Sequence, residues 1–218
     1  MEMQESNIVK VFGRKCWIVC SLFVFVACNA PIRSVPYYLT PDLSPVWSSD
    51  SINAQSHTIN AFSFTNQNNE LFGSNQLAGK IYVANFFFTA CPSICPKMTN
   101  NLSKVAEHFK SNQHIEIISF SVTPDMDSVP VLRNYHKLHN LGKKWHLLTG
   151  DQSEIYTLAR QSYFVEERFG LNATSEEFLH TERCVLIDRN GDIRGVYNAT
   201  LSLDMERIID DINALLTE

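Results

Sequence analysis

Two cysteines, Cys91 and Cys95, follow a strongly hydrophobic run, residues 83–88, in a chain of 218 residues. A pair of thiols four residues apart can close a disulfide or hold a soft metal ion. The run predicts a buried strand, and the cysteines come where that strand ends and a helix begins. This edge of an α/β sheet is where side chains meet ligands. The spacing of the thiols leaves both kinds of chemistry open.

The residues around the cysteines favour reactive sulfur. Pro96 fits the first turn of a helix, because it has no backbone N–H to donate. Both sulfurs then face the positive end of the helix dipole, which favours the thiolate that attacks disulfides and binds metal.

Three residues separate the cysteines, whereas thioredoxin-type oxidoreductases usually have two. This wider loop can still form a disulfide, but it can also open around a large soft ion. Two thiolates select Cu(I), zinc or iron–sulfur chemistry, and one added imidazole gives a trigonal site suited to copper.

The elements that must position these thiols alternate between strands and helices. The pattern predicts a hairpin over 58–72, strands at 81–88, 115–122 and 145–148, helices at 96–110, 128–141 and 151–162, a second hairpin over 183–197 and a last helix over 201–216. Residues 163–180 have no clear period, so we expect a long loop that is mobile without metal. This order indicates an α/β protein with a thioredoxin-like fold, a central mixed sheet flanked by helices, with N-terminal and C-terminal β-hairpins.

Among the seven histidines, His180 stands out because it shortly precedes the strand predicted at 183–188. In a thioredoxin-like sheet this strand runs antiparallel to the central one, so the loop before it arrives beside the cysteines. A surface histidine capping a loop is the alternative interpretation. His136 and His139 lie on one face of a predicted helix and indicate a solvated surface. Asp125 follows the next parallel strand on the same rim, where it could orient a ligand or contact a partner, although a helix cap explains it equally well.

The N-terminus has the features of an export signal. Lys10, Arg14 and Lys15 precede an apolar run that is shorter than the roughly 20 residues of a membrane-spanning helix. The run ends in Phe-Val-Ala-Cys, which resembles a bacterial lipobox with Cys28 as the site of lipidation. We therefore interpret residues 1–28 as a lipoprotein-type signal and membrane anchor on the periplasmic side. An uncleaved anchor helix and simple secretion are the alternatives.

Composition divides the rest of the chain into two parts. Residues 29–55 contain several Pro, Ser and Asn residues, which predicts a flexible tether. Residues 56–218 are long enough for one domain with a real core. The formal net charge of −5 argues against a nucleic-acid partner, which usually needs a concentrated basic face.

Export also changes how the six cysteines are interpreted. Cys16 and Cys20 lie in the leader and Cys28 is the predicted lipid site. A disulfide-stapled secreted scaffold would have more cysteines, evenly paired. We therefore expect one working pair and one buried single cysteine, Cys184.

The body of the chain resembles the Sco/SenC family over roughly residues 56–216. The resemblance rests on Phe-Phe-Phe-Thr-Ala-Cys-Pro-Ser-Ile-Cys-Pro-Lys-Met and on residues 57–64, 120–125, 145–150 and 179–188. It implies a membrane-tethered, thioredoxin-fold copper chaperone for the dinuclear copper centre of cytochrome c oxidase. By position it implies Cys91 and Cys95 as thiolate ligands and His180 as the third ligand. Thr123 stands where the family often has an aspartate, so no role of that acidic residue carries over.

Two functions follow from these observations. In the first, a monomeric chaperone binds Cu(I), or Cu(II) with an added oxygen ligand, and its partner is the copper-binding subunit of the oxidase, with other copper chaperones as further candidates. In the second, a thiol–disulfide oxidoreductase reduces the copper-ligand cysteines of the oxidase. Cys91 would then attack and Cys95 would resolve the mixed disulfide. We expect a metallochaperone rather than an enzyme. A peroxidase of related fold is the weakest alternative, since no peroxide-activating set is evident.

Overall fold

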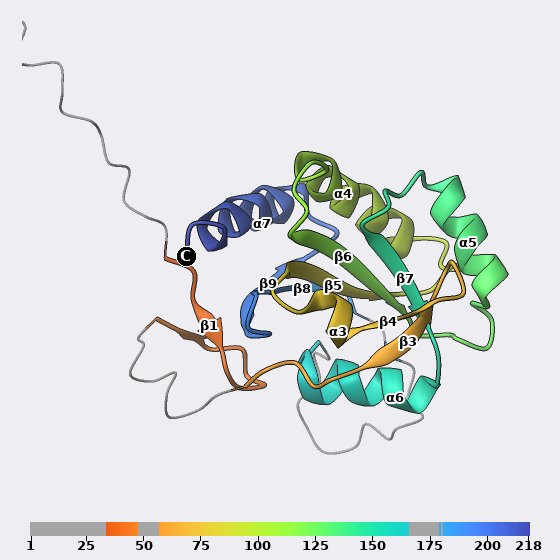
Figure 1. Ribbon diagram of the computed structural model, residues 1–218, viewed down its shortest axis with the longest axis horizontal. Helices are drawn as coiled ribbons and strands as arrows, with labels where there is room; N and C mark the ends of the chain where they lie inside the picture. Colours follow the sequence, from red (N-terminus) through yellow and green to blue (C-terminus); the bar gives the residue numbers. More distant parts are fainter. Residues whose placement is uncertain (1–33, 48–56, 166–178, 180) are drawn as a thin grey trace, which may run out of the picture. The chain divides into compact units, whose positions relative to one another are not determined.

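The computed structural model describes residues 34–47, 57–165, 179 and 181–218 (Figure 1). The strands are β1 (Tyr37–Tyr38), β2 (Pro45–Val46), β3 (Ser63–Asn66), β4 (Leu71–Gly73), β5 (Ile81–Phe87), β6 (Ile115–Ser121), β7 (Trp145–Thr149), β8 (Arg183–Ile187) and β9 (Ile193–Asn198). The helices are α3 (Ser74–Leu77), α4 (Ile94–His108), α5 (Val129–Leu138), α6 (Gln152–Thr157) with a π-helical continuation η1 (Leu158–Ser162), and α7 (Ser202–Leu215).

Seven strands form one mixed sheet in the order β4-β3-β7-β6-β5-β8-β9. β5, β6 and β7 are parallel, and antiparallel strands extend both sides. This arrangement confirms the predicted fold class, including both hairpins. Because β8 is antiparallel to β5, Cys184 near the start of β8 pairs with Asn85 near the end of β5. The chain that enters β8 therefore arrives at the edge of the sheet where the cysteines follow β5.

Helices cover both faces of the sheet (Figure 1). All seven residues of β5 are buried, which explains the continuous apolar run in the sequence. The first core cluster joins α4, α5 and α7 to one face of the sheet through apolar side chains that include Met98, Leu102, Leu132, Ile208 and Ile212. The second joins α3, α6 and η1 to the other face through side chains that include Leu77, Ile155, Ala159, Ile118 and Phe120.

A short polar chain crosses the buried middle of the sheet. The hydroxyl of Ser119 donates to Oδ1 of Asn85 at 2.6 Å, and Nε1 of Trp145 donates to the Ser119 hydroxyl at 2.9 Å. These three residues come from β5, β6 and β7. Their hydrogen bonds satisfy the one polar residue of β5, and a shift in strand register would break them.

Part of the predicted tether belongs to the folded body. Residues 34–47 form the hairpin β1–β2, and Val35 and Leu39 are buried. Arg194 of β9 donates to the carbonyl oxygens of Val35 (2.8 Å) and Pro36 (3.2 Å). The prediction of a flexible tether over 29–55 is therefore wrong for residues 34–47. Prolines limit regular structure, but they do not prevent apolar side chains from packing when a neighbouring side chain satisfies the backbone carbonyls.

The predicted loop over 163–180 also begins in the core. Tyr163, Phe164 and Val165 are buried, and the hydroxyl groups of Tyr163 and Tyr82 lie 3.1 Å apart. Leu179 is buried as well. The expectation of a mobile loop is thus wrong for these residues, because they pack under the sheet. Residues 166–178 and 180 lie outside the described part of the chain.

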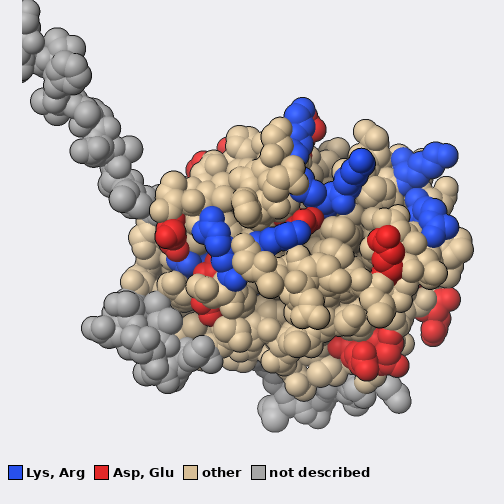
Figure 2. All heavy atoms as spheres, in the orientation of Figure 1, with Lys and Arg blue, Asp and Glu red and all other residues tan. Residues whose placement is uncertain are grey.

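The surface carries charges of both signs. On the face in Figure 2, Lys and Arg side chains and Asp and Glu side chains both appear, and some of them lie next to one another. Among the described residues, none of the helices has the length and apolar character needed to cross a membrane.

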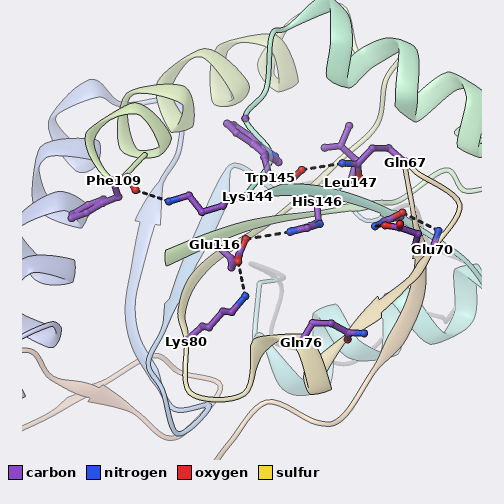
Figure 3. Close-up of polar contacts among 12 residues, drawn as sticks. Gln67, Glu70, Gln76, Lys80, Phe109, Glu116, Lys144, Trp145, His146 and Leu147 are labelled. Atoms are coloured by element: carbon purple, nitrogen blue, oxygen red, sulfur yellow. Dashed lines mark hydrogen bonds and ion pairs between the residues drawn. The ribbon is translucent and has the colours of Figure 1, made fainter. Parts of the chain in front are cut away.

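One ion-pair network lies at the start of the parallel strands (Figure 3). Nζ of Lys80 lies 2.7 Å from Oε1 of the buried Glu116, and Nε2 of His146 lies 3.2 Å from Oε2 of the same carboxylate. Phe72 stacks on the imidazole of His146 at 3.8 Å between ring centroids. Burial alone raises the pKa of Glu116, but the hydrogen bonds from His146 and Lys80 outweigh it, so the pKa lies below its ordinary value of 4.5.

We expect Glu116→Gln to change how stability depends on pH. A carboxylate whose pKa is lowered in the folded state stabilises the fold above its unfolded pKa, and this contribution is lost as pH falls through the folded value. The free energy of unfolding of the parent should therefore fall below about pH 4.5, and that fall should be shallower in the variant. Urea unfolding at several pH values measures this. Glu107→Gln, which alters an exposed pair with Lys110, is the control and should keep the parent slope. An unchanged slope in Glu116→Gln would contradict the assignment.

Candidate thiol and metal site

The two cysteines lie on either side of the turn that starts α4. The backbone N–H of Cys91 donates to the carbonyl oxygen of Phe88 at 3.3 Å, which closes the turn after β5. Ser93 is the N-cap residue, and Pro96 lies in the first helical turn as predicted. The N–H of Cys95 donates to Sγ of Cys91 at 3.4 Å. The first sulfur thus receives a donor from the N-terminus of the helix that carries the second.

Both thiols are free and well covered. Cys91 is 7% exposed and Cys95 is 3% exposed, and both border the core cluster under α4 and α5. Cys184 is also free, and it is fully buried on β8. The prediction of a buried single cysteine is confirmed. Cys91 and Cys95 remain as two soft donors placed together at the end of β5.

The surroundings of the two thiols shift their pKa values in opposite directions. Burial raises the pKa of the Cys91 thiol, but the backbone N–H groups of Cys95, Ser93 and Ile94 outweigh it, so the pKa is lowered. Burial raises the pKa of the Cys95 thiol to about 12, and the neighbouring sulfur of Cys91 adds to the shift. Cys91 is therefore the first of the pair to become a thiolate.

A buried carboxylate supports the loop before the cysteines. Asp127 accepts hydrogen bonds from the backbone N–H of Thr89 (3.2 Å), the Thr89 hydroxyl (2.5 Å) and the Ser121 hydroxyl (2.6 Å). The Thr123 hydroxyl donates to the same carboxylate at 3.2 Å. Asp127 thereby joins the loop that leads to Cys91 to the end of β6.

The sequence pattern singles out Asp125 in this loop and gives no role to Asp127. Asp125, the predicted candidate, is exposed, whereas Asp127 is fully buried. The only local signal for Asp127 is its place directly before Ser128, the N-cap residue of α5. Which of the two carboxylates turns inward depends on packing between β5, β6 and α5, and no local pattern contains that information.

In the part of the chain that the structure describes, none of the histidines singled out in the sequence lies beside the two thiols. His180 lies outside the described residues, although its neighbours Leu179 and Thr181 are both buried. His136 is half-buried, and its Nε2 lies 3.2 Å from the carbonyl oxygen of Gly142. Within the described ranges, no three His, Cys, Asp or Glu side chains gather as a metal site. The described donor set is the pair of sulfurs, which fits a soft ion or a disulfide.

Comparison with known proteins identifies similar chains. A SCO1/SenC family model matches residues 50–217. A SCO1 protein homolog from Bacillus subtilis (strain 168) is 30% identical over 166 residues, which are 74% of this chain and 84% of the homolog.

Solved structures are similar over most of the body. A SCO1/SenC family lipoprotein from Bacillus anthracis has a TM-score of 0.64 at 30% identity, covering 73% of this chain and 95% of that one. BsSco, described as a member of the Sco family of cytochrome c oxidase assembly proteins, has a TM-score of 0.62 at 28% identity, covering 74% and 94%. Bradyrhizobium japonicum ScoI with copper bound has a TM-score of 0.55 at 25% identity, covering 70% and 99%.

We predict that Cys91 of the reduced protein is alkylated faster than Cys95. Its lowered pKa provides more thiolate, and the reaction should continue at pH values where an ordinary thiol with a pKa of 9.0 is largely protonated. Timed iodoacetamide labelling with mass spectrometry of the peptides measures each rate. Cys184 should react only on unfolding, and in denaturant the three rates should converge. Faster labelling of Cys95 in the folded protein would refute the order.

Asp127→Ala should destabilise the fold, whereas Asp125→Ala should not. Removing the buried carboxylate leaves donors of Thr89 and Ser121 unpaired, at a cost of about 1–3 kcal/mol each. The exposed Asp125 is the matched control, with a change within about 0.5 kcal/mol. Guanidinium chloride unfolding compares both variants with the parent. Equal losses for the two variants would contradict the role given to Asp127.

Proposed function

This chain belongs to the SCO1/SenC family, and from that membership we propose that it is a membrane-tethered copper chaperone. It delivers copper to the dinuclear copper centre of cytochrome c oxidase during assembly of the oxidase. The observation that carries the proposal is the pair of free, buried thiols at the N-terminus of α4. The copper-bound relative and the relative described as an oxidase assembly protein support the same cargo and the same target.

In this proposal the copper ligands are Cys91, Cys95 and His180. Two thiolates and an imidazole form a trigonal donor set that suits Cu(I). The Cys91 thiolate captures the ion first, because its pKa is lowered. Cys95 gives up its proton as it binds, since the ion compensates the cost of a buried thiolate. His180 completes the set on the chain that enters β8.

Delivery proceeds by ligand exchange without a change in oxidation state. Each Cu–S bond broken here is replaced by a Cu–S bond to a thiolate of the acceptor. Protons return to Cys95 and then to Cys91 as the ion leaves. The copper-binding subunit of the oxidase is the acceptor that the family membership indicates.

Membrane attachment completes the proposal. We place the lipid on Cys28 and the domain on the periplasmic side, and the related lipoprotein from Bacillus anthracis supports this location. Attachment raises the concentration of the domain near a membrane-bound acceptor.

A second function, thiol–disulfide exchange, is favoured by the different pKa shifts of the two thiols. In thiol–disulfide exchange, the Cys91 thiolate attacks an acceptor disulfide and releases one acceptor thiolate. The Cys95 sulfur then displaces the second, and its proton passes to a released thiolate. The pair loses two electrons and becomes a disulfide, while the acceptor disulfide becomes two thiols. The lowered pKa of Cys91 and the raised pKa of Cys95 suit an attacking and a resolving thiol.

An anaerobic Cu(I) titration against a competing chelator tests the first function. The reduced protein should hold one Cu(I), and His180→Ala should weaken the affinity by at least about 10–100-fold, because a ligand is lost. His114→Ala is the matched control, since His114 is exposed and its ring has no role in the proposed site.

The titration also separates the two functions. Weak Cu(I) binding, or binding that is indifferent to His180, would contradict the chaperone. Reduction of a disulfide substrate that continues in His180→Ala with the chelator present would then favour the oxidoreductase.

A further inference from the structure

The hairpin β1–β2 is held on the body by a buried arginine. Arg194 is 3% exposed and donates to the backbone carbonyls of Val35 and Pro36. Its guanidinium also lies 3.9 Å from the ring centroid of Tyr37. Asp188 (3.0 Å) and Glu218 (2.8 Å) pair with the same guanidinium. The hairpin is therefore tied to the β8–β9 turn and to the C-terminus, so it moves with the domain.

This attachment shortens the chain that can act as a tether. Only residues 29–33 separate Cys28 from the described hairpin, instead of the whole segment 29–55. An extended chain spans at most about 3.3–3.6 Å per residue, so this linker reaches roughly 20 Å. The limit is the same for a lipid on Cys28 and for an anchor helix that ends there. The hairpin must then lie close to the bilayer, which rests on the proposed membrane attachment.

The hairpin presents an apolar side chain suited to that position. Trp47 directly follows Val46, which pairs with Tyr37. It is 63% exposed, and among the large exposed hydrophobic side chains of the described residues it is the only aromatic one. Tryptophan prefers the membrane–water interface, because its ring is apolar and its N–H finds polar partners. Pro45, two residues before Trp47 in β2, is also exposed.

We propose that Trp47 inserts into the interfacial layer of the bilayer and that the β1–β2 hairpin is the membrane-facing surface of the domain. Residues 34–47 contain one charged residue, Asp42, and no Lys or Arg. The contact therefore depends on apolar insertion, and zwitterionic lipid is sufficient. A single aromatic contact is weak, but the short linker gives it a high effective concentration.

This orientation has a consequence for the thiols. Arg194 lies near the start of β9, and β9 runs in the same direction as β5, because both are antiparallel to β8. Cys91 and Cys95 follow the opposite end of β5. A strand of seven residues is about 23 Å long. The membrane-facing surface lies where β5 and β9 start, and the thiols lie where β5 ends. This leaves the thiols open to the extramembrane part of an acceptor.

Fluorescence quenching in nanodiscs tests the proposal. The full chain, in a Trp17→Phe background, is reconstituted in phosphatidylcholine with bromines near the top of the acyl chains. Two tryptophans of the body remain, and Trp145 is buried and bonded to Ser119, so it serves as an internal reference. The emission that is lost in a further Trp47→Phe variant belongs to Trp47. We expect this emission to be quenched by the brominated lipid, and we expect added salt not to change the quenching.

The control is a matched reporter on β4, the outermost strand on the side of the sheet away from β9. Leu71 is 71% exposed on β4, and β4 and β9 are the two edges of the sheet, roughly 30 Å apart at about 4.8 Å per strand. Leu71→Trp in the Trp47→Phe background should not be quenched. If the protein stays with the discs but Trp47 is not quenched, the insertion of Trp47 is overturned, while the proposed membrane attachment is not contradicted. Equal quenching at both positions also overturns the insertion of Trp47. Protein that separates from the discs overturns both the insertion of Trp47 and the proposed membrane attachment. The Cu(I) titration tests the chaperone function independently of either.

Discussion

The pairing of β5 with β6 on one side and β8 on the other fixes where the chemistry of this protein occurs. β5 is buried throughout its length, so its register is held by packing on both faces and by the hydrogen bonds among Asn85, Ser119 and Trp145. Its parallel partner directs the next loop, with Asp127, to the same edge as the cysteines. Its antiparallel partner brings the start of β8 to that edge as well. Three segments far apart in the sequence thus meet where the sheet ends.

At that edge the protein keeps two thiols close together and nearly excluded from water. Exclusion alone would hold both thiols protonated, because burial disfavours the charged form. The backbone N–H groups at the start of α4 reverse this effect for Cys91 and leave Cys95 protonated. The pair can therefore accept a soft cation in two steps or exchange a disulfide, and Asp127 holds the loop in place for either reaction. A third ligand would favour the binding of a soft cation, so His180, the third ligand in the proposed function, is the most informative residue to change.

The hairpin held by Arg194 bears on the proposed membrane attachment at Cys28. A long flexible tether would allow the thiols to approach an acceptor from any direction. In the proposed attachment, five residues lie between Cys28 and the described chain, and together with a hairpin bound to the body they would limit both distance and orientation. The buried guanidinium pairs with the carboxylates of Asp188 and Glu218 and donates to the backbone carbonyls of residues 35 and 36. The same network joins both ends of the described body.

The order of the elements and the place of Cys91 and Cys95 could be predicted before folding was considered, because apolar periodicity and the proline in the first turn of α4 are local signals. The sequence also identified the family through residues grouped around those signals. Three features emerge only when the chain is folded: Asp127 rather than Asp125 turns inward, residues 34–47 pack on β9, and residues 163–165 lie in the core. Burial of each depends on side chains that are distant in the sequence, such as Thr89, Arg194 and Tyr82, so no local window contains the answer. The different pKa shifts of the two thiols likewise come from the fold, since both are cysteines in one short motif and only their depth and their N–H donors differ.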